Sequence, residues 1–123
     1  MKKMLKTIAA ASMAVFMLGS TAFAASSYSG SGAGGLITGT LKIYDSYATA
    51  TTVNKTSSSA NAYASVKVYY YTSSGTYYWS SSAENSGTSY TSATRKVSSG
   101  TVAGAESAHG SSKNSISFNL SSE

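Results

Sequence analysis

The stretch Ala62-Tyr63-Ala64-Ser65-Val66-Lys67-Val68-Tyr69-Tyr70-Tyr71 has the clearest pattern in the chain. Alternate positions are apolar, and the positions between them are Tyr, Ser or Lys. This period of two predicts a β-strand with one apolar face. The next residues, Thr72-Ser73-Ser74-Gly75, supply a turn, and Thr76-Tyr77-Tyr78-Trp79 is a second aromatic run. We therefore expect a hairpin over residues 61–83, on which the other strands pair.

The rest of the chain alternates short β-favouring runs with Ser/Gly-rich turns. Further runs cover residues 36–53, 88–97, 101–108 and 115–120, and turns are expected at 84–87, 98–100 and 109–113. In the first run, Leu41, Ile43, Tyr47 and Val53 share one parity, and Asp45-Ser46 is expected to bend the chain. The sequence predicts an all-β fold, a small antiparallel sandwich of immunoglobulin-like architecture with about six or seven short strands.

Residues 1–24 have the three parts of a secretory signal peptide. Lys2, Lys3 and Lys6 precede an apolar run over 8–18, and Ala22-Phe23-Ala24 is a small-x-small cleavage pattern. The apolar run is too short to span a membrane, which takes about 20 residues. We predict a helical signal segment that is cleaved after Ala24, and a mature protein that is secreted to the extracellular space, with non-covalent retention on the cell envelope as an option.

Two segments are expected after the signal. Residues 25–35 are rich in Ser and Gly, which is typical of a flexible arm, and residues 36–123 form a single β domain. Gly30, Gly32 and Gly35 match the spacing of a dinucleotide-binding loop. That motif requires a preceding strand and a following helix, and neither is predicted here. We interpret these glycines as part of the arm.

Charge and cysteine content narrow the classes of partner. Beyond residue 24 the chain carries six basic and four acidic residues, a net charge of +2, and the basic residues are scattered. No stripe suited to nucleic acid is present, and no second apolar segment predicts a membrane span. The chain has no Cys for disulfides or lipid attachment. A thin core, rich in Ala and Thr, leaves oligomerisation open as a source of stability.

The sequence offers no catalytic or metal-binding pattern. His109 is the only His, and it falls at an expected strand end or turn. No Gly-x-Ser-x-Gly elbow accompanies the many Ser residues. The carboxylates are spread through the chain without the clustering of a metal site. We therefore predict that the protein is not an enzyme, and that it uses no cofactor and no metal.

The aromatic residues of the expected hairpin are the candidate binding residues. Tyr69, Tyr71, Tyr78 and Trp79 form the predicted binding surface, since exposed Tyr and Trp offer a large rigid area with a polar tip. The alternative is that the aromatics pack in the core. The alternation favours the core for Tyr70 and Trp79, and the surface for Tyr69 and Tyr71.

Three functions fit these features. The first is a secreted, non-catalytic binding or structural module that acts on an envelope polysaccharide, a host glycan or another protein. The second is a small secreted, bacteriocin-like toxin whose hairpin inserts into membranes, as strands with alternating polar and apolar residues do. The third is a self-assembling fibre or matrix subunit, because residues 66–71 combine high β-propensity with a single charge, at Lys67.

Overall fold

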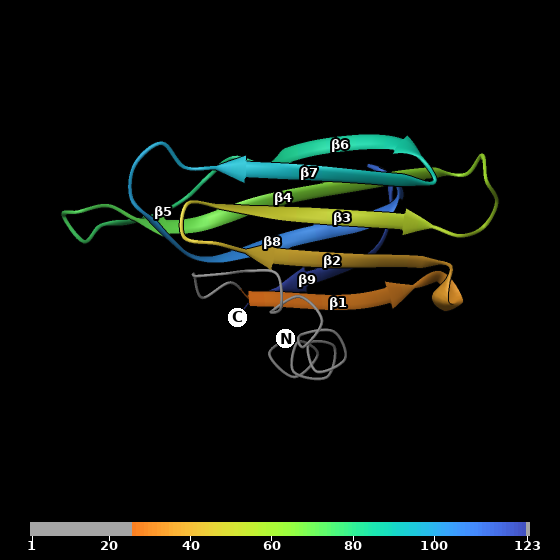
Figure 1. The fold of residues 1–123 in the computed structure, drawn as a ribbon, viewed down its shortest axis with the longest axis horizontal. Coiled ribbons are helices and arrows are strands. Elements are labelled where there is room, and N and C mark those ends of the chain that lie inside the picture. Colours follow the sequence, from red (N-terminus) through yellow and green to blue (C-terminus); the bar gives the residue numbers. More distant parts are fainter. Residues whose placement is uncertain (1–25, 123) are drawn as a thin grey trace.

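The computed structural model describes residues 26–122, which form two antiparallel β-sheets packed face to face (Figure 1). The all-β prediction is confirmed, with nine strands in the described residues. The predicted signal segment lies outside them. The strands are β1 (Ser26–Gly32), β2 (Ile37–Ile43), β3 (Tyr47–Asn54), β4 (Asn61–Tyr71), β5 (Tyr77–Trp79), β6 (Ala83–Thr88), β7 (Tyr90–Lys96), β8 (Thr101–Ser112) and β9 (Ser115–Ser121).

The chain crosses between the sheets several times. Sheet A has the order β1-β2-β3-β7, and sheet B has the order β5-β4-β8-β9, with β6 also paired to β4. The first three strands form a meander in sheet A, the chain passes to sheet B for β4, β5 and β6, returns for β7, and ends in sheet B with β8 and β9. In Figure 1 the hairpin of β4 and β5 projects beyond the ends of the other strands.

The core lies between the sheets and consists mostly of small side chains. Alternation in β2, β3 and β4 directs every second residue inward, as a two-layer sandwich requires. Leu41 and Leu120 are the largest fully buried apolar side chains. The buried cluster is Leu41, Ile43, Ala48, Ala50, Ala64, Val66, Val68, Ala93, Val102, Ala105 and Leu120. This small-residue core agrees with the thin core expected from the composition.

The predicted bend at Asp45-Ser46 is present. Before it the odd-numbered residues face the core, whereas after it the even-numbered residues do. Ile43 pairs with Ala48 across the turn, so Ala48 and Ala50 join the core. Tyr47 and Val53, which were expected to share the face of Leu41, are only partly buried. The sequence pattern missed this because the parity after a turn depends on the turn's length.

The Ser/Gly segment begins with a strand where a flexible arm was expected. β1 pairs with β2 along its whole length, from Ser26 opposite Ile43 to Gly32 opposite Ile37. A short 3₁₀ turn, Ala33–Gly35, joins the two strands. Gly34 and Gly35 adopt φ values of 68° and 95°, which favour glycine. The Gly-rich motif therefore supplies a strand and its turn.

Two expected turns also prove to be strands. Residues 84–87 lie in β6 and pair with β4, and the chain reverses instead at Ser89, whose φ is 66°. β8 runs through the expected turn at 109–113 as far as Ser112, because both of its neighbours, β4 and β9, pair with it there. Polar residues continue a strand in these places because cross-strand backbone pairing outweighs their local preference for turns.

Candidate binding surface

Four aromatic side chains gather on the outer face of sheet B. Tyr69 pairs with Trp79, and Tyr71 pairs with Tyr77, so the four residues share one face of the β4–β5 hairpin. Ring centroids lie 5.2 Å apart for Tyr69 and Tyr77, 5.0 Å for Tyr69 and Trp79, and 5.3 Å for Tyr71 and Tyr77. Tyr77 is 51% exposed and Trp79 is 47% exposed. We call Tyr69, Tyr71, Tyr77 and Trp79 the aromatic patch.

A one-residue bulge follows the patch directly, between β5 and β6. Trp79 pairs with Tyr69 of β4, and Ala83 pairs with Val66 of β4. Three residues, 80–82, separate Trp79 from Ala83, whereas only two, 67 and 68, separate Val66 from Tyr69, so one extra residue bulges out of the ladder. Ser80 spans the irregularity with two bonds: the Val68 amide donates to the Ser80 Oγ at 3.0 Å, and the Ser80 amide donates to the Val68 carbonyl at 2.8 Å. These bonds tie the chain to β4 at the residue that follows Trp79.

Lys67 joins the patch to a charged pair. Its Nζ lies 4.8 Å from the centroid of the Trp79 ring, within cation–π distance. The same Nζ lies 3.7 Å from Oε1 of Glu106 on the neighbouring strand β8. Both side chains are well exposed, so the ion pair contributes little to stability. It does place a donor and an acceptor beside the aromatic rings with no net charge.

A groove of about 380 Å³ continues from Lys67 across sheet B. It is open to solvent and runs over β4, β8 and β9. Hydroxyl, amide and charged groups lie along it among apolar surface, and its lining residues are Ser65, Lys67, Ser82, Glu106, Ser107, Ala108, Asn119, Leu120 and Ser121. Because Lys67 belongs both to this groove and to the edge of the aromatic patch, the two features are adjacent.

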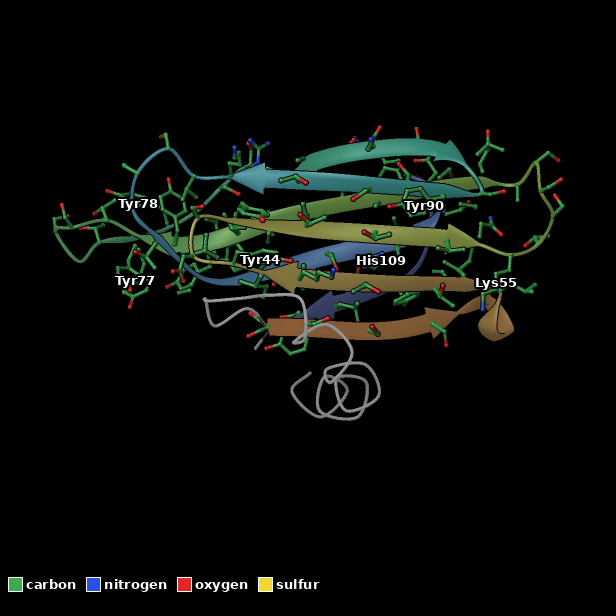
Figure 2. The ribbon with its side chains drawn as sticks, viewed as in Figure 1. Tyr44, Lys55, Tyr77, Tyr78, Tyr90 and His109 are labelled. Atoms are coloured by element: carbon green, nitrogen blue, oxygen red, sulfur yellow. The ribbon has the colours of Figure 1, made fainter. Side chains whose placement is uncertain are left out.

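The outer face of sheet A is different in character. Its neighbouring strands carry Ser and Thr hydroxyls that bond one another across the sheet, such as Thr51 with Ser92 at 3.3 Å and Thr49 with Thr94 at 3.2 Å. Tyr90, at the start of β7, is 57% exposed and lies far along the molecule from Tyr77 and Tyr78 (Figure 2). Sheet A does carry one aromatic pair, Tyr44 and Tyr47, whose rings stack at 4.5 Å between centroids at the turn between β2 and β3. The larger group of four aromatic side chains lies on sheet B.

The structure brings together three of the four predicted site residues. Tyr69, Tyr71 and Trp79 lie in the aromatic patch, whereas Tyr78 pairs with Tyr70 on the opposite face of the hairpin, with ring centroids 5.7 Å apart. Trp79 was expected in the core and is exposed instead, while Tyr70 does pack against the core. The bulge at 80–82 lies beyond these positions, so the β4–β5 register alone decides the faces.

Sequence reasoning missed Tyr77 and the groove. The signal for Tyr77 was available, because a turn of three residues, 73–75, that closes at Thr72 and Thr76 places Tyr77 opposite Tyr71. The groove had no such signal. Its residues come from three strands that are distant in sequence, and only the pairing of β4 with β8 and of β8 with β9 brings them together.

His109 lies inside the sandwich, not at the turn or edge where it was expected. It is fully buried, and its ring stacks on Phe118 with centroids 5.1 Å apart. Nδ1 is 2.7 Å from the Thr52 Oγ1, and Nε2 is 2.8 Å from the Ser107 Oγ. Burial lowers the pKa of His109 to about 4, although a hydrogen bond to the Thr51 backbone acts in the opposite direction. The neutral imidazole therefore serves as a satisfied polar link between the two sheets.

Residues 26–122 contain neither a metal-binding cluster nor a membrane-spanning helix. No group of three or more His, Asp or Glu side chains in this range could hold a metal ion. Within the same range, no helix has the length and apolar character needed to cross a membrane. Comparison of the chain with protein-family models, with curated proteins and with solved structures found no match.

Proposed function

We propose that the chain is a secreted, non-catalytic binding module that acts outside the cell, at or near the cell surface, through the aromatic patch. The observation that carries this proposal is the patch itself. Four large aromatic side chains share one solvent-facing surface, and two of them are about half exposed. Clusters of Tyr and Trp anchor ligands and partners because they offer rigid contact area at low entropic cost.

The scaffold supports the same proposal. Sheet B holds the patch on paired strands, so a ligand would meet a preformed surface. The two antiparallel sheets and the repeated crossing of the chain between them are compatible with the immunoglobulin-like architecture that we infer from the sequence. Secretion rests on the pattern of residues 1–24.

The test is co-sedimentation of the secreted protein with purified cell-envelope material. We expect the wild-type protein to sediment with it, and the double variant Tyr77→Ala/Trp79→Ala to remain in solution. Tyr90→Ala is the matched control, since Tyr90 is equally exposed but lies on sheet A. Equal sedimentation of the wild type and the double variant, or none by either, would overturn the proposal.

The membrane-active alternative requires the hairpin to leave the sheet. β4 also pairs with β6 on the side of β5 and with β8 on the other side, so insertion of residues 62–83 into a membrane would break the β4–β6 and β4–β8 ladders, whereas the β4–β5 pairing would stay within the hairpin. A leakage assay with dye-filled liposomes tests this alternative. Release of dye by the folded protein would favour the membrane-active function over the binding function.

If the protein self-assembles, the strands available for pairing between molecules are not the ones that the sequence predicted. Residues 66–71 belong to a strand with neighbours on both sides. β1 and β9 are the edge strands of the two sheets, at the ends away from β7 and β5. Charged residues and Pro commonly protect sheet edges from pairing with another chain, and neither β1 nor β9 contains one. Sedimentation velocity over a range of protein concentrations distinguishes a monomer from a growing assembly.

A further inference from the structure

We propose that the aromatic patch and the adjoining groove form one elongated site for an uncharged polysaccharide chain. This inference rests on the proposed function and names its ligand class. A sugar ring presents an apolar face of C–H groups and an edge of hydroxyls, so it needs an aromatic ring beneath it and hydrogen-bonding side chains beside it. The outer face of sheet B supplies both, side by side.

The first step is the stacking surface. Tyr77 and Trp79 each expose about half of their area, and Tyr69 packs against both of them at about 5 Å between centroids. The Tyr69 ring stacks on that of Tyr77, with 24° between the planes, and meets that of Trp79 at 40°, so it braces both exposed rings. The rings are held in place before a ligand arrives, which reduces the entropy lost on binding.

The second step is the chemistry of the groove. Ser65, Ser82 and Ser121 offer hydroxyls, and Asn119 offers an amide, so the lining both donates and accepts hydrogen bonds. Sugar hydroxyls do the same, and the two sets are complementary. The groove is open to solvent and its lining comes from β4, β8 and β9, which suits a ligand longer than a single sugar ring.

The third step is charge. Lys67 and Glu106 are the charged residues of the groove lining, and they form an ion pair with each other, so the lining has no net charge. An acidic polymer would meet the Glu106 carboxylate, and its attraction to Lys67 would compete with the existing pair. The pair is better suited to hydroxyl groups, which Lys67 can donate to while Glu106 accepts from them. The charge balance thus favours a neutral chain.

The test uses the fluorescence of Trp79, which is the only Trp in the chain. The secreted protein is titrated with hexasaccharides derived from cellulose, chitin, mannan and xylan, with their monosaccharides, and with polygalacturonate as an acidic chain. We expect at least one neutral hexasaccharide to change the emission of Trp79, and to bind at least tenfold more tightly than its monosaccharide. The acidic chain should bind more weakly.

A pair of Asn variants tests the groove separately from the patch. Asn119 lines the groove, whereas Asn114 is exposed in the turn between β8 and β9. Loss of one ligand hydrogen bond weakens binding by about fivefold. We expect Asn119→Ala to lower the affinity for the hexasaccharide by about this factor, and Asn114→Ala to leave it unchanged. Both side chains are exposed, so both variants should keep the wild-type unfolding temperature.

The outcomes separate this inference from the proposed function. If envelope binding depends on the patch but no neutral hexasaccharide affects Trp79, the binding module stands and the ligand class is wrong. The same conclusion follows if the acidic chain binds more tightly. If hexasaccharides and monosaccharides bind equally well, or if Asn119→Ala has no effect, the groove is not part of the site. If neither envelope material nor any sugar binds, both proposals fail.

Discussion

Gly39 and His109 fit together because Gly39 lacks a side chain. A Cβ atom at Gly39 would overlap the imidazole of His109 at Nδ1, Cγ and Cε1. The ring cannot easily retreat, since Thr52 and Ser107 hold its two nitrogens and Phe118 stacks on it. The buried contact between sheet A and sheet B at this point therefore depends on two residues from distant parts of the chain.

We expect Gly39→Ala to lower the free energy of unfolding by about 1–3 kcal/mol, the usual cost of overpacking a well-packed core. The backbone at Gly39 has no positive φ, so the cost comes from the contact with His109 alone. Urea unfolding measures it. The control is the same substitution made in a His109→Ala background, where the added methyl group meets empty space. An equal cost in both backgrounds would contradict this explanation.

Stability should fall as the pH is lowered from about 6.5 to about 4. The pKa of His109 is lowered from 6.5 to about 4 by burial, so in this window the unfolded chain binds a proton that the folded chain excludes. The stabilising contribution is complete above pH 6.5 and is lost as the pH approaches 4. A shift of this size corresponds to about 3 kcal/mol.

The measurement is urea unfolding at a series of pH values between 7.5 and 4. His109→Gln is the control, because Gln retains hydrogen-bonding capacity but does not titrate. Its stability should change much less over the same range, with the remaining change due to the carboxylates. A wild-type protein and a Gln variant with parallel pH profiles would show that His109 is not the group responsible.

Removal of the exposed aromatic rings should leave the fold almost intact. Trp79→Ala and Tyr77→Ala should each change the free energy of unfolding by less than about 1 kcal/mol, as expected for exposed positions. Val68→Ala, in the core of the same hairpin, should cost about 2 kcal/mol. Thermal unfolding compares the three variants. If Trp79→Ala were as costly as Val68→Ala, the patch would be structural.

The Ser80 hydroxyl should matter both for stability and for the patch. Ser80→Ala removes the acceptor of the Val68 amide, which costs about 1 kcal/mol. Because Ser80 follows Trp79 directly, we also expect weaker envelope binding and faster exchange of the Val68 amide proton. Ser81→Ala, next to it and exposed, is the control. An unchanged Val68 exchange rate in Ser80→Ala would show that the bond does not hold β5.

Hydrogen exchange should rank the strands by their position in the sheets. We expect the amides of residues 64–68 in β4 to exchange most slowly, since β4 has partners on both sides and an inward face in the core. The tip of the hairpin at residues 73–75 should exchange fastest. Rapid exchange in β4 would instead support the view that its hairpin opens readily, as insertion into a membrane requires.

The sequence by itself determined the class of fold and the central element. Period-two alternation in 62–70 predicted a strand with the correct inward residues, Ala62, Ala64, Val66 and Val68, because alternate side chains of a strand point to opposite faces. The Ser-Ser-Gly turn and the bend at Asp45 were also predictable, since these residues favour turns for local reasons.

Only the tertiary structure decided which aromatics share a face and where His109 lies. A shift of one residue in pairing reverses the face of a side chain, so the placement of Tyr78 and Trp79 depended on the exact register of β5 against β4. His109 is buried because β4 and β9 extend the pairing of β8 past the expected turn, and because Gly39 on the other sheet leaves room for the ring. These contacts join strands that are distant in the sequence, so local sequence patterns do not predict them.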